Sequence, residues 1–178
     1  MLGAVIGDIA GSRFEFDNYR HTDFDIFSPD SDFTDDTICT VAISDWVLQG
    51  CNDNLASILQ GWCRAYPCPK GAYGGRFSQW IEWKDPEPYN SWGNGSAMRV
   101  SAVGWAFATL EETLHFAEQS AIVTHNHPEG IKGAQAVAAA IFWARTGIGK
   151  AQIKENITRQ FGYDLSQSCD QIRPYYHF

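Results

Sequence analysis

The sequence predicts an all-α protein. Three observations support this fold class: apolar residues recur at helical spacing in most segments, glycine or proline ends several of those segments, and alternating runs of β-branched residues are scarce. The 178 residues are enough for one domain, and 44% of them are apolar, as in an ordinary globular protein. We therefore expect a single helical domain over residues 1–178.

The amino-terminal half is expected to contain three helices. In the first, glycines recur every fourth residue and would share one face, where a neighbouring backbone could approach closely (Gly3, Gly7, Gly11). Residues 17–32 are rich in Asp and indicate a loop. Apolar spacing predicts the other two helices, from Thr34 to Gly50 and over residues 55–66, where two prolines end the second.

The carboxy-terminal half begins with an irregular connection. Residues 67–95 contain four Pro and five Gly, a composition typical of a loop that carries binding groups. Small apolar residues over 97–108 predict a buried helix. Thr109 with Glu112 is a capping-box pattern that opens the next helix, and Pro128 suits the first turn of another. A last short helix should end at Gly162.

The charge and the cysteine content exclude several classes of function. With 13 basic and 21 acidic residues the net charge is −8, which argues against a protein that binds nucleic-acid phosphates. The apolar runs are too short to span a membrane, and the start of the chain lacks the basic region of a signal peptide. The five cysteines form no C-x-x-C motif. We expect a reduced, cytoplasmic protein.

Acidic residues near the first two helices have two interpretations. Asp35 and Asp36, after the N-cap Thr34, can complement a helix dipole, or all three can bind magnesium through hard oxygen ligands. Asp8 lies in an apolar helix and needs a partner, either as the cap of a neighbouring element or as a catalytic group. Glu15 follows in a turn, from which it could reach a cleft or remain at the surface.

Two later segments are also open to two interpretations. Gly93-Asn94-Gly95 opens a helix and could bind a phosphate or form a plain turn, while Arg99 could bind a carboxylate or brace that loop. His125 and His127 do not have the spacing of a helical zinc pair, which favours structural roles in a turn.

The order of these motifs is more specific than any one of them. G-D-I-A-G at 7–11, F-T-D-D-T at 33–37, G-N-G-S-A-M-R at 93–99 and T-H-N-H-P-E-G at 124–130 together resemble the ADP-ribosylglycohydrolase family, from Leu2 to about Tyr176. The resemblance implies an all-α fold with a two-magnesium centre at the base of an ADP-ribose cleft. It also implies hydrolysis of the bond between the anomeric carbon of ADP-ribose and an acceptor, often an arginine side chain.

The resemblance assigns roles to individual residues. Thr34, Asp35 and Asp36 match metal ligands, and Glu15 with the two Asp would form the catalytic group. Asp8 matches a buried acid to which we assign structural support. The ligand-binding set comprises the glycine-rich loop and one histidine (Gly93, Asn94, Gly95, Ser96, His125).

One family feature has no match here. The family's later acidic motif, G-D-x-D-T, would supply the remaining metal ligands, and no such segment is present. We expect weak magnesium binding and exposed apolar surface, which self-association could cover. Two functions follow: magnesium-dependent hydrolysis of ADP-ribosylated protein, or an impaired relative that binds ADP-ribose or an ADP-ribosylated partner without turnover. A remnant with no activity of its own is a third outcome.

Overall fold

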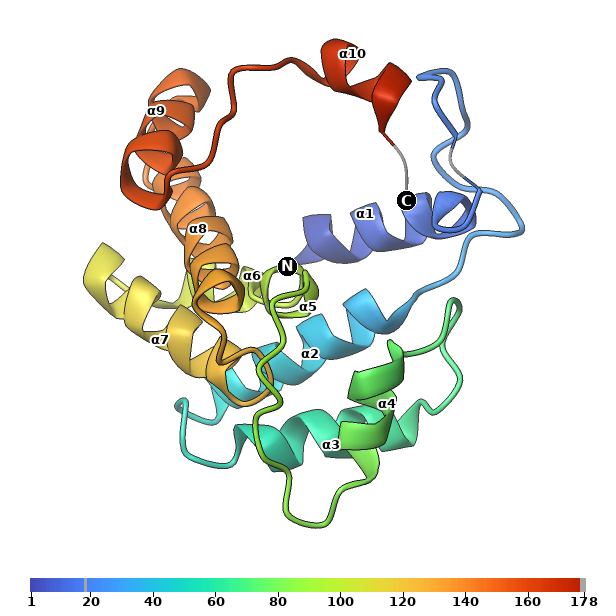
Figure 1. Cartoon of the computed structure of the whole chain (residues 1–178), viewed down its shortest axis with the longest axis vertical. Coiled ribbons are helices and arrows are strands. Elements are labelled where there is room, and N and C mark those ends of the chain that lie inside the picture. Colours follow the sequence, from blue (N-terminus) through green and yellow to red (C-terminus); the bar gives the residue numbers. More distant parts are fainter. Residues whose placement is uncertain (18, 177–178) are drawn as a thin grey trace.

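The computed structural model describes residues 1–17 and 19–176 and confirms the all-α class (Figure 1). No strand occurs in this part of the chain, and Thr34 and Lys70 form an isolated parallel bridge. The helices are α1 (Leu2–Gly11), η1 (Ser12–Phe14), α2 (Asp35–Leu48), α3 (Leu55–Ala65), α4 (Gly75–Glu82), α5 (Gly95–Met98), α6 (Ser101–Ala106), α7 (Leu110–Ile122), α8 (Pro128–Arg145), α9 (Lys150–Phe161), α10 (Cys169–Ile172) and η2 (Arg173–Tyr175).

Helix α2 lies at the centre of the packing. It contacts α1 on one side, α3 on another and α6 on a third, and in Figure 1 it runs between α1 and α3. The most extensive helix pair is α7 with α8, and α9 packs on α8. The start of α2, where the predicted acids lie, is therefore held between the amino-terminal helix and the rest of the bundle.

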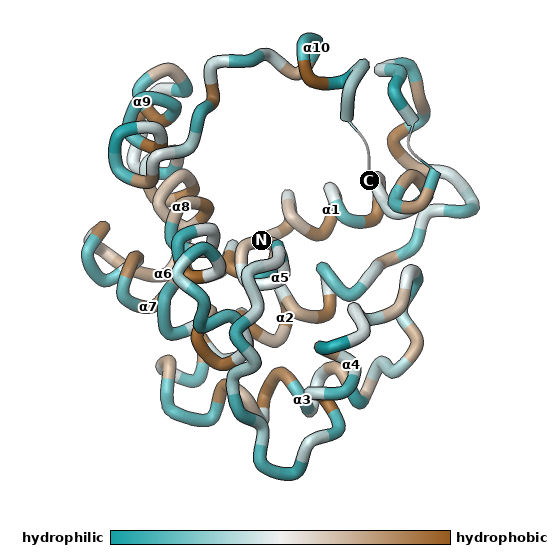
Figure 2. The backbone as a smooth tube through the Cα atoms, in the orientation of Figure 1, coloured by the Kyte–Doolittle hydropathy of each residue, from teal (hydrophilic) through white to brown (hydrophobic). Residues whose placement is uncertain are grey.

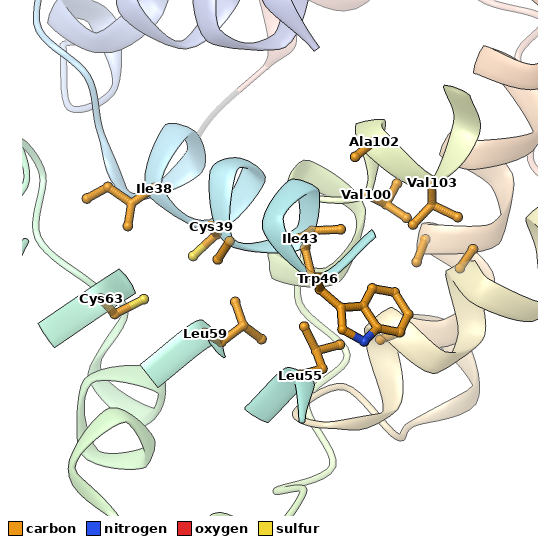
Figure 3. Close-up of a cluster of buried hydrophobic side chains, with 14 of the residues drawn as sticks. Ile38, Cys39, Ile43, Trp46, Leu55, Leu59, Cys63, Val100, Ala102 and Val103 are labelled. Atoms are coloured by element: carbon orange, nitrogen blue, oxygen red, sulfur yellow. The ribbon is translucent and has the colours of Figure 1, made fainter. Parts of the chain in front are cut away.

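The main core lies between α2, α3 and α6. Ile43 and Trp46 of α2 face Leu59 of α3, and Val103 of α6 completes this buried cluster (Figure 3). A smaller buried cluster joins α8 to α9. Burial of these apolar side chains is the main force that holds the helices together.

A close approach between α6 and α8 depends on a glycine. A Cβ atom added to Gly104 would lie 2.6 Å from the Cβ of Ile141 and 2.9 Å from the backbone oxygen of Ala138. No side chain fits in that space, so Gly104 sets the distance between these two helices.

The predicted helix ends are largely confirmed. The Thr34 hydroxyl caps α2 by accepting a bond from Asp36 N, and Thr109 forms the full capping box with Glu112 at α7. Pro128 is the first residue of α8. Gly162 ends α9 with φ of 74°, a left-handed conformation that glycine adopts without strain.

Two predicted segments are wrong in detail. The connection over 67–95 contains α4, whose Trp80 and Ile81 are buried, because one apolar face outweighs the surrounding Pro and Gly. The helix predicted over 97–108 is broken into α5 and α6. Arg99 and Val100 lie between the two helices, with ψ of −8° and −3°. The break in the helix allows both side chains to be buried.

The glycine face of α1 does not receive another backbone. Cβ atoms added to Gly3, Gly7 or Gly11 would meet nothing within 4 Å, and α1 has no buried residue. Leu2 and Ile6 are 79% and 48% exposed, although the helix is among the more apolar ones in Figure 2. The expected close approach is therefore absent from the described residues, and an apolar face of α1 remains uncovered.

The segment after α9 returns to the amino-terminal loop. It crosses the molecule to α10 (Figure 1), and the Arg20 guanidinium donates to the backbone oxygens of Pro174 (2.7 Å) and Tyr176 (2.9 Å). None of the described helices is both long enough and apolar enough to cross a membrane.

Candidate functional site

A cavity of about 530 Å³ brings most of the predicted site residues together. Its wall combines the turn after α1, the start of α2, the loop before α4, the glycine-rich loop at α5 and the segment before α8. The predicted residues that line it are Glu15, Asp35, Asp36, Gly93, Asn94, Gly95, Arg99 and His125. Five separate regions of the sequence thus meet in one cavity.

Asp8 organises the start of α2. Its carboxylate accepts bonds from the backbone N–H of Thr34 (2.9 Å) and of Thr37 (3.2 Å) and from both threonine hydroxyls. These bonds satisfy N–H groups that a helix start leaves free. The interpretation of Asp8 as the cap of a neighbouring element is confirmed.

The acids in the cavity repel one another. Burial raises the pKa of Asp35 to about 7, with further contributions from the negative charges of Asp36 and Glu15. Burial also raises the pKa of Asp36 to about 6, and the Asp8 and Glu15 carboxylates add to this effect.

Glu15 is held against the backbone of another loop. Its Oε2 atom is buried and has no hydrogen-bond partner among the described residues, and a Cβ atom on Gly71 would lie 2.6 Å from it. Burial and the Asp8 charge raise the pKa of Glu15, while Lys70 opposes them. A buried carboxylate oxygen without a donor indicates that positive charge or a donor from a ligand is needed here.

A second hollow, of about 380 Å³, lies between α1 and the same acids. Gly7, Asp8 and Thr34 line it, and Glu15, Asp36 and Asn94 line both this hollow and the main cavity. The acidic centre can therefore be reached from two sides.

The donor atoms present suit a hard divalent cation. Thr34, Asp35 and Asp36 offer hydroxyl and carboxylate oxygens, the ligand type that magnesium prefers. Within the described part of the chain, no cationic side chain offsets the charge of the two aspartates. Among the described residues, however, no three His, Cys, Asp or Glu side chains form a group that could hold a metal ion. These residues fit a cation in chemistry and charge but supply an incomplete set of ligands.

The glycine-rich loop is only partly directed at the cavity. Gly93, Asn94 and Gly95 line it, and Gly93 N donates to the Ser91 hydroxyl. Ser96 does not line it, because its buried hydroxyl donates to the backbone oxygen of Gly130 (2.7 Å) and ties the loop to α8.

The two histidines have different roles. His127 caps α8 by accepting a bond from Glu129 N at its Nδ1 atom, the structural role favoured by the sequence. His125 lines the cavity, with its Nδ1 atom 2.8 Å from the hydroxyl of Thr124. Burial, with a contribution from Arg99, lowers the pKa of His125 to about 3, so the ring is neutral near pH 7.

Arg99 ties the end of α5 to the end of α7, and no carboxylate of the described residues binds it. Its side chain is buried, and Nη2 donates to the backbone oxygen of Ser120 (2.8 Å) and to the hydroxyl of Thr124 (2.9 Å).

Sequence reasoning missed part of the cavity wall. Tyr73 and Arg76 line it, as does Tyr89, whose ring lies 5.1 Å from the Arg76 guanidinium carbon and whose backbone oxygen accepts a bond from that side chain. The Pro- and Gly-rich composition of residues 67–95 indicated a binding loop, but no local pattern identified these side chains.

The fold and the cavity define a helical protein with a polar, acid-lined site at the start of α2. The family model described as ADP-ribosylglycohydrolase matches residues 1–173, and the chain belongs to this family.

Two relatives are named ADP-ribosylhydrolase ARH3. The Xenopus tropicalis protein is 26% identical over 175 residues, covering 83% of this chain and 49% of the relative. The Mus musculus protein is 36% identical over 62 residues, covering 35% of this chain and 17% of the relative. The chain thus spans at most about half the length of these relatives.

Proposed function

We propose that this chain binds the ADP-ribosyl group of a modified protein in the 530 Å³ cavity and hydrolyses its glycosidic bond to the acceptor. The observation that carries the proposal is the meeting of Glu15, Asp35 and Asp36 with the glycine-rich loop and His125 in one cavity, in a chain of this family. An arginine side chain is the acceptor we propose to test first.

The proposed chemistry assigns a role to each part of the cavity. The loop at Gly93–Gly95 would contact the diphosphate and ribose, and His125 would contact the ligand beside it. Glu15 would take a proton from the attacking water and stabilise the positive charge that develops at the anomeric carbon as the bond to the acceptor nitrogen breaks. The proton that Glu15 takes from water would then pass to the acceptor nitrogen as that nitrogen leaves.

We propose magnesium as the cofactor of this reaction. Thr34, Asp35 and Asp36 would hold it, because they carry hard oxygen donors and unneutralised charge at the same helix start. When bound, magnesium would supply positive charge beside the ribose and lower the pKa of water at the site. Because the ligand set is incomplete, we expect weak binding.

The proposal is tested by release of free ADP-ribose from an arginine-ADP-ribosylated protein, with magnesium and with EDTA. We expect release that needs magnesium and that Asp35→Ala abolishes. Asp164→Ala is the matched control, because Asp164 is an exposed acid in the segment after α9 and does not line the cavity. Absence of release in both conditions contradicts the proposed hydrolysis of this substrate.

A second function is favoured by one observation. In the described part of the chain no three His, Cys, Asp or Glu side chains form a metal-binding group, which favours binding of ADP-ribose or an ADP-ribosylated partner without turnover. A ligand that binds the folded state raises the melting temperature by mass action. A rise with ADP-ribose, together with no release of product, would select binding without hydrolysis.

The proposal also includes a cytoplasmic location and self-association of the chain. All five cysteines are free thiols, which supports a reducing, cytoplasmic setting. The uncovered face of α1, with Leu2 and Ile6, supports self-association of the chain.

A further inference from the structure

We propose that Arg99 and Thr124 act as positioning residues that fix His125 as the neutral tautomer with its proton on Nε2, so that the ring presents a permanent hydrogen-bond donor to the cavity. The identity of the ligand rests on the proposed function, whereas the tautomer itself is a property of the protein alone.

The first step concerns the hydroxyl of Thr124. An arginine can only donate, so the bond from Arg99 Nη2 (2.9 Å) makes the Thr124 oxygen an acceptor. Arg99 is held in this position because Nη2 also donates to the backbone oxygen of Ser120. Thr124 is fully buried, so its single hydroxyl proton needs an acceptor inside the protein.

The second step follows from what surrounds that proton. In the described part of the chain the remaining partner of the Thr124 hydroxyl is Nδ1 of His125, at 2.8 Å. If Nδ1 carried a proton, it would face a hydroxyl oxygen whose own proton had no acceptor. The arrangement that satisfies every group has Nδ1 accepting from Thr124, which places the ring proton on Nε2.

The third step concerns the orientation of the ring. A Cβ atom on Gly95 would lie 2.9 Å from Cε1 and 3.0 Å from Nε2 of His125, and a Cβ atom on Gly130 would lie 2.9 Å from its Cβ. The imidazole thus fills space that Gly95 leaves free, and Gly130 allows the His125 Cβ atom to lie close to α8; both contacts restrict the position of the ring. The Arg99 charge and burial disfavour a second proton on the ring.

The fourth step concerns the other ring nitrogen. His125 lines the cavity beside Asn94 and Gly95, and Nε2 has no hydrogen-bond partner among residues 1–17 and 19–176. A fixed N–H at this position fits an acceptor oxygen on the ligand. In ADP-ribose such oxygens belong to the diphosphate and to the ribose hydroxyls.

The test reads the tautomer directly by long-range ¹H–¹⁵N correlation of the imidazole nitrogens in the whole chain without ligand, near pH 7.5. We expect His125 to show a protonated Nε2 and an unprotonated Nδ1. His127 is an internal reference, because its Nδ1 accepts a bond from Glu129 N and must also lack a proton in the neutral ring. A proton on Nδ1 of His125, or a doubly protonated ring, overturns the proposal.

Two variants separate positioning from a general structural effect. Thr124→Val removes the hydroxyl at similar volume, and we expect His125 to shift toward the Nδ1–H tautomer while His127 is unchanged. Thr124→Ser keeps the hydroxyl and should retain the wild-type pattern. An unchanged His125 tautomer in Thr124→Val contradicts the proposal, and if that variant does not fold, the wild-type and Thr124→Ser spectra still decide.

Ligand binding forms the second arm of the experiment. Loss of one hydrogen bond to the ligand corresponds to about a tenfold weaker affinity, so we expect about tenfold weaker binding of ADP-ribose by Thr124→Val and near wild-type binding by Thr124→Ser. If wild type does not bind ADP-ribose, the proposed function fails. The tautomer result stays readable, because it is recorded without ligand.

Discussion

At the residue scale, one carboxylate holds the acidic centre together. Asp8 belongs to α1, yet its bonds go to the backbone and hydroxyls of Thr34 and Thr37 at the start of α2. The Thr34 hydroxyl donates to Asp8 and accepts from Asp36 N, which fixes its orientation. The arrangement of the acids in the cavity therefore depends on a side chain outside the main cavity wall.

Replacing Asp8 should weaken the whole protein. Asp8→Ala leaves two backbone N–H groups and two hydroxyls without their acceptor, so we expect a loss of about 2 kcal/mol in the free energy of unfolding. Urea denaturation measures this loss. Asp32→Ala is the matched control, because that exposed carboxylate accepts from Phe33 N only. Equal losses for both variants would contradict the role of Asp8.

The repulsion between acids predicts a pH-dependent stability. The pKa of Asp35 is raised to about 7 in the folded chain, above its unfolded value. The folded state then binds more protons between about pH 4 and pH 7, so this group lowers stability as the pH rises through that window. Without divalent ions, Asp35→Asn should stabilise the protein at pH 8 and much less at pH 5.

Melting temperatures measure this difference. After allowance for solvent at a half-buried group, we expect a gain of about 1–2 kcal/mol at pH 8, or roughly 2–8 °C. The lowered pKa of His125, about 3, makes both proteins more stable at higher pH by the same amount. This contribution therefore cancels when the two proteins are compared. Asp164→Asn is the control, because a bond from Ser166 lowers the pKa of Asp164. The same gain for Asp35→Asn at pH 5 and pH 8 would refute the repulsion.

The sequence located most individual residues of the cavity but not their partners. Thr34, Asp35 and Asp36 could be found because a capped helix start is a local pattern. The contact of Arg99 with Thr124 could not, because it joins two segments that are far apart in the chain. The inward turn of Ser96 depends likewise on Gly130 of α8.

At the element scale, some helices could be predicted from local sequence signals, whereas others depend on tertiary packing. Caps and stops predicted α2, α7, α8 and α9, since each is marked by residues within one or two turns. The break between α5 and α6 was not predictable, because it follows from the burial of Arg99 and Val100 against other elements.

Two glycines in helices give a matched test of helix packing. Gly104→Ala places a methyl group against Ile141 and the backbone of Ala138, so we expect a loss of about 1–3 kcal/mol. Gly61 of α3 has nothing within 4 Å of an added Cβ, and Gly61→Ala should gain about 0.5–1 kcal/mol. Thermal unfolding measures both changes, and a destabilised Gly61→Ala or a neutral Gly104→Ala would refute this reading of the contact.

At the scale of the whole molecule, α1 is attached to the bundle through a polar side chain, while its apolar face is exposed to solvent. Asp8 ties it to α2, while Leu2 and Ile6 face away from any buried cluster. The exposed face of α1 could not be predicted from the glycine pattern. Such a pattern shows which face of a helix lacks side chains, but it does not show whether another element packs against that face.

Self-association should follow from that open face. We expect sedimentation velocity to show a species heavier than the 19.9 kDa chain as concentration rises. Ile6→Glu should shift the distribution to the monomer because it places a charge on the apolar face. Leu48→Glu, at an 87% exposed site at the end of α2, should leave it unchanged. A monomer at all concentrations contradicts the proposed assembly.

The contact between Glu15 and Gly71 has a consequence for the history of the sequence. The acid occupies the space that a side chain at Gly71 would fill, and the left-handed φ of 81° at that glycine disfavours any other residue. A side chain at position 71 would therefore require the Glu15 carboxylate to move from its present place. In a set of related sequences, we expect glycine at 71 and the acid at 15 to be gained and lost as a pair.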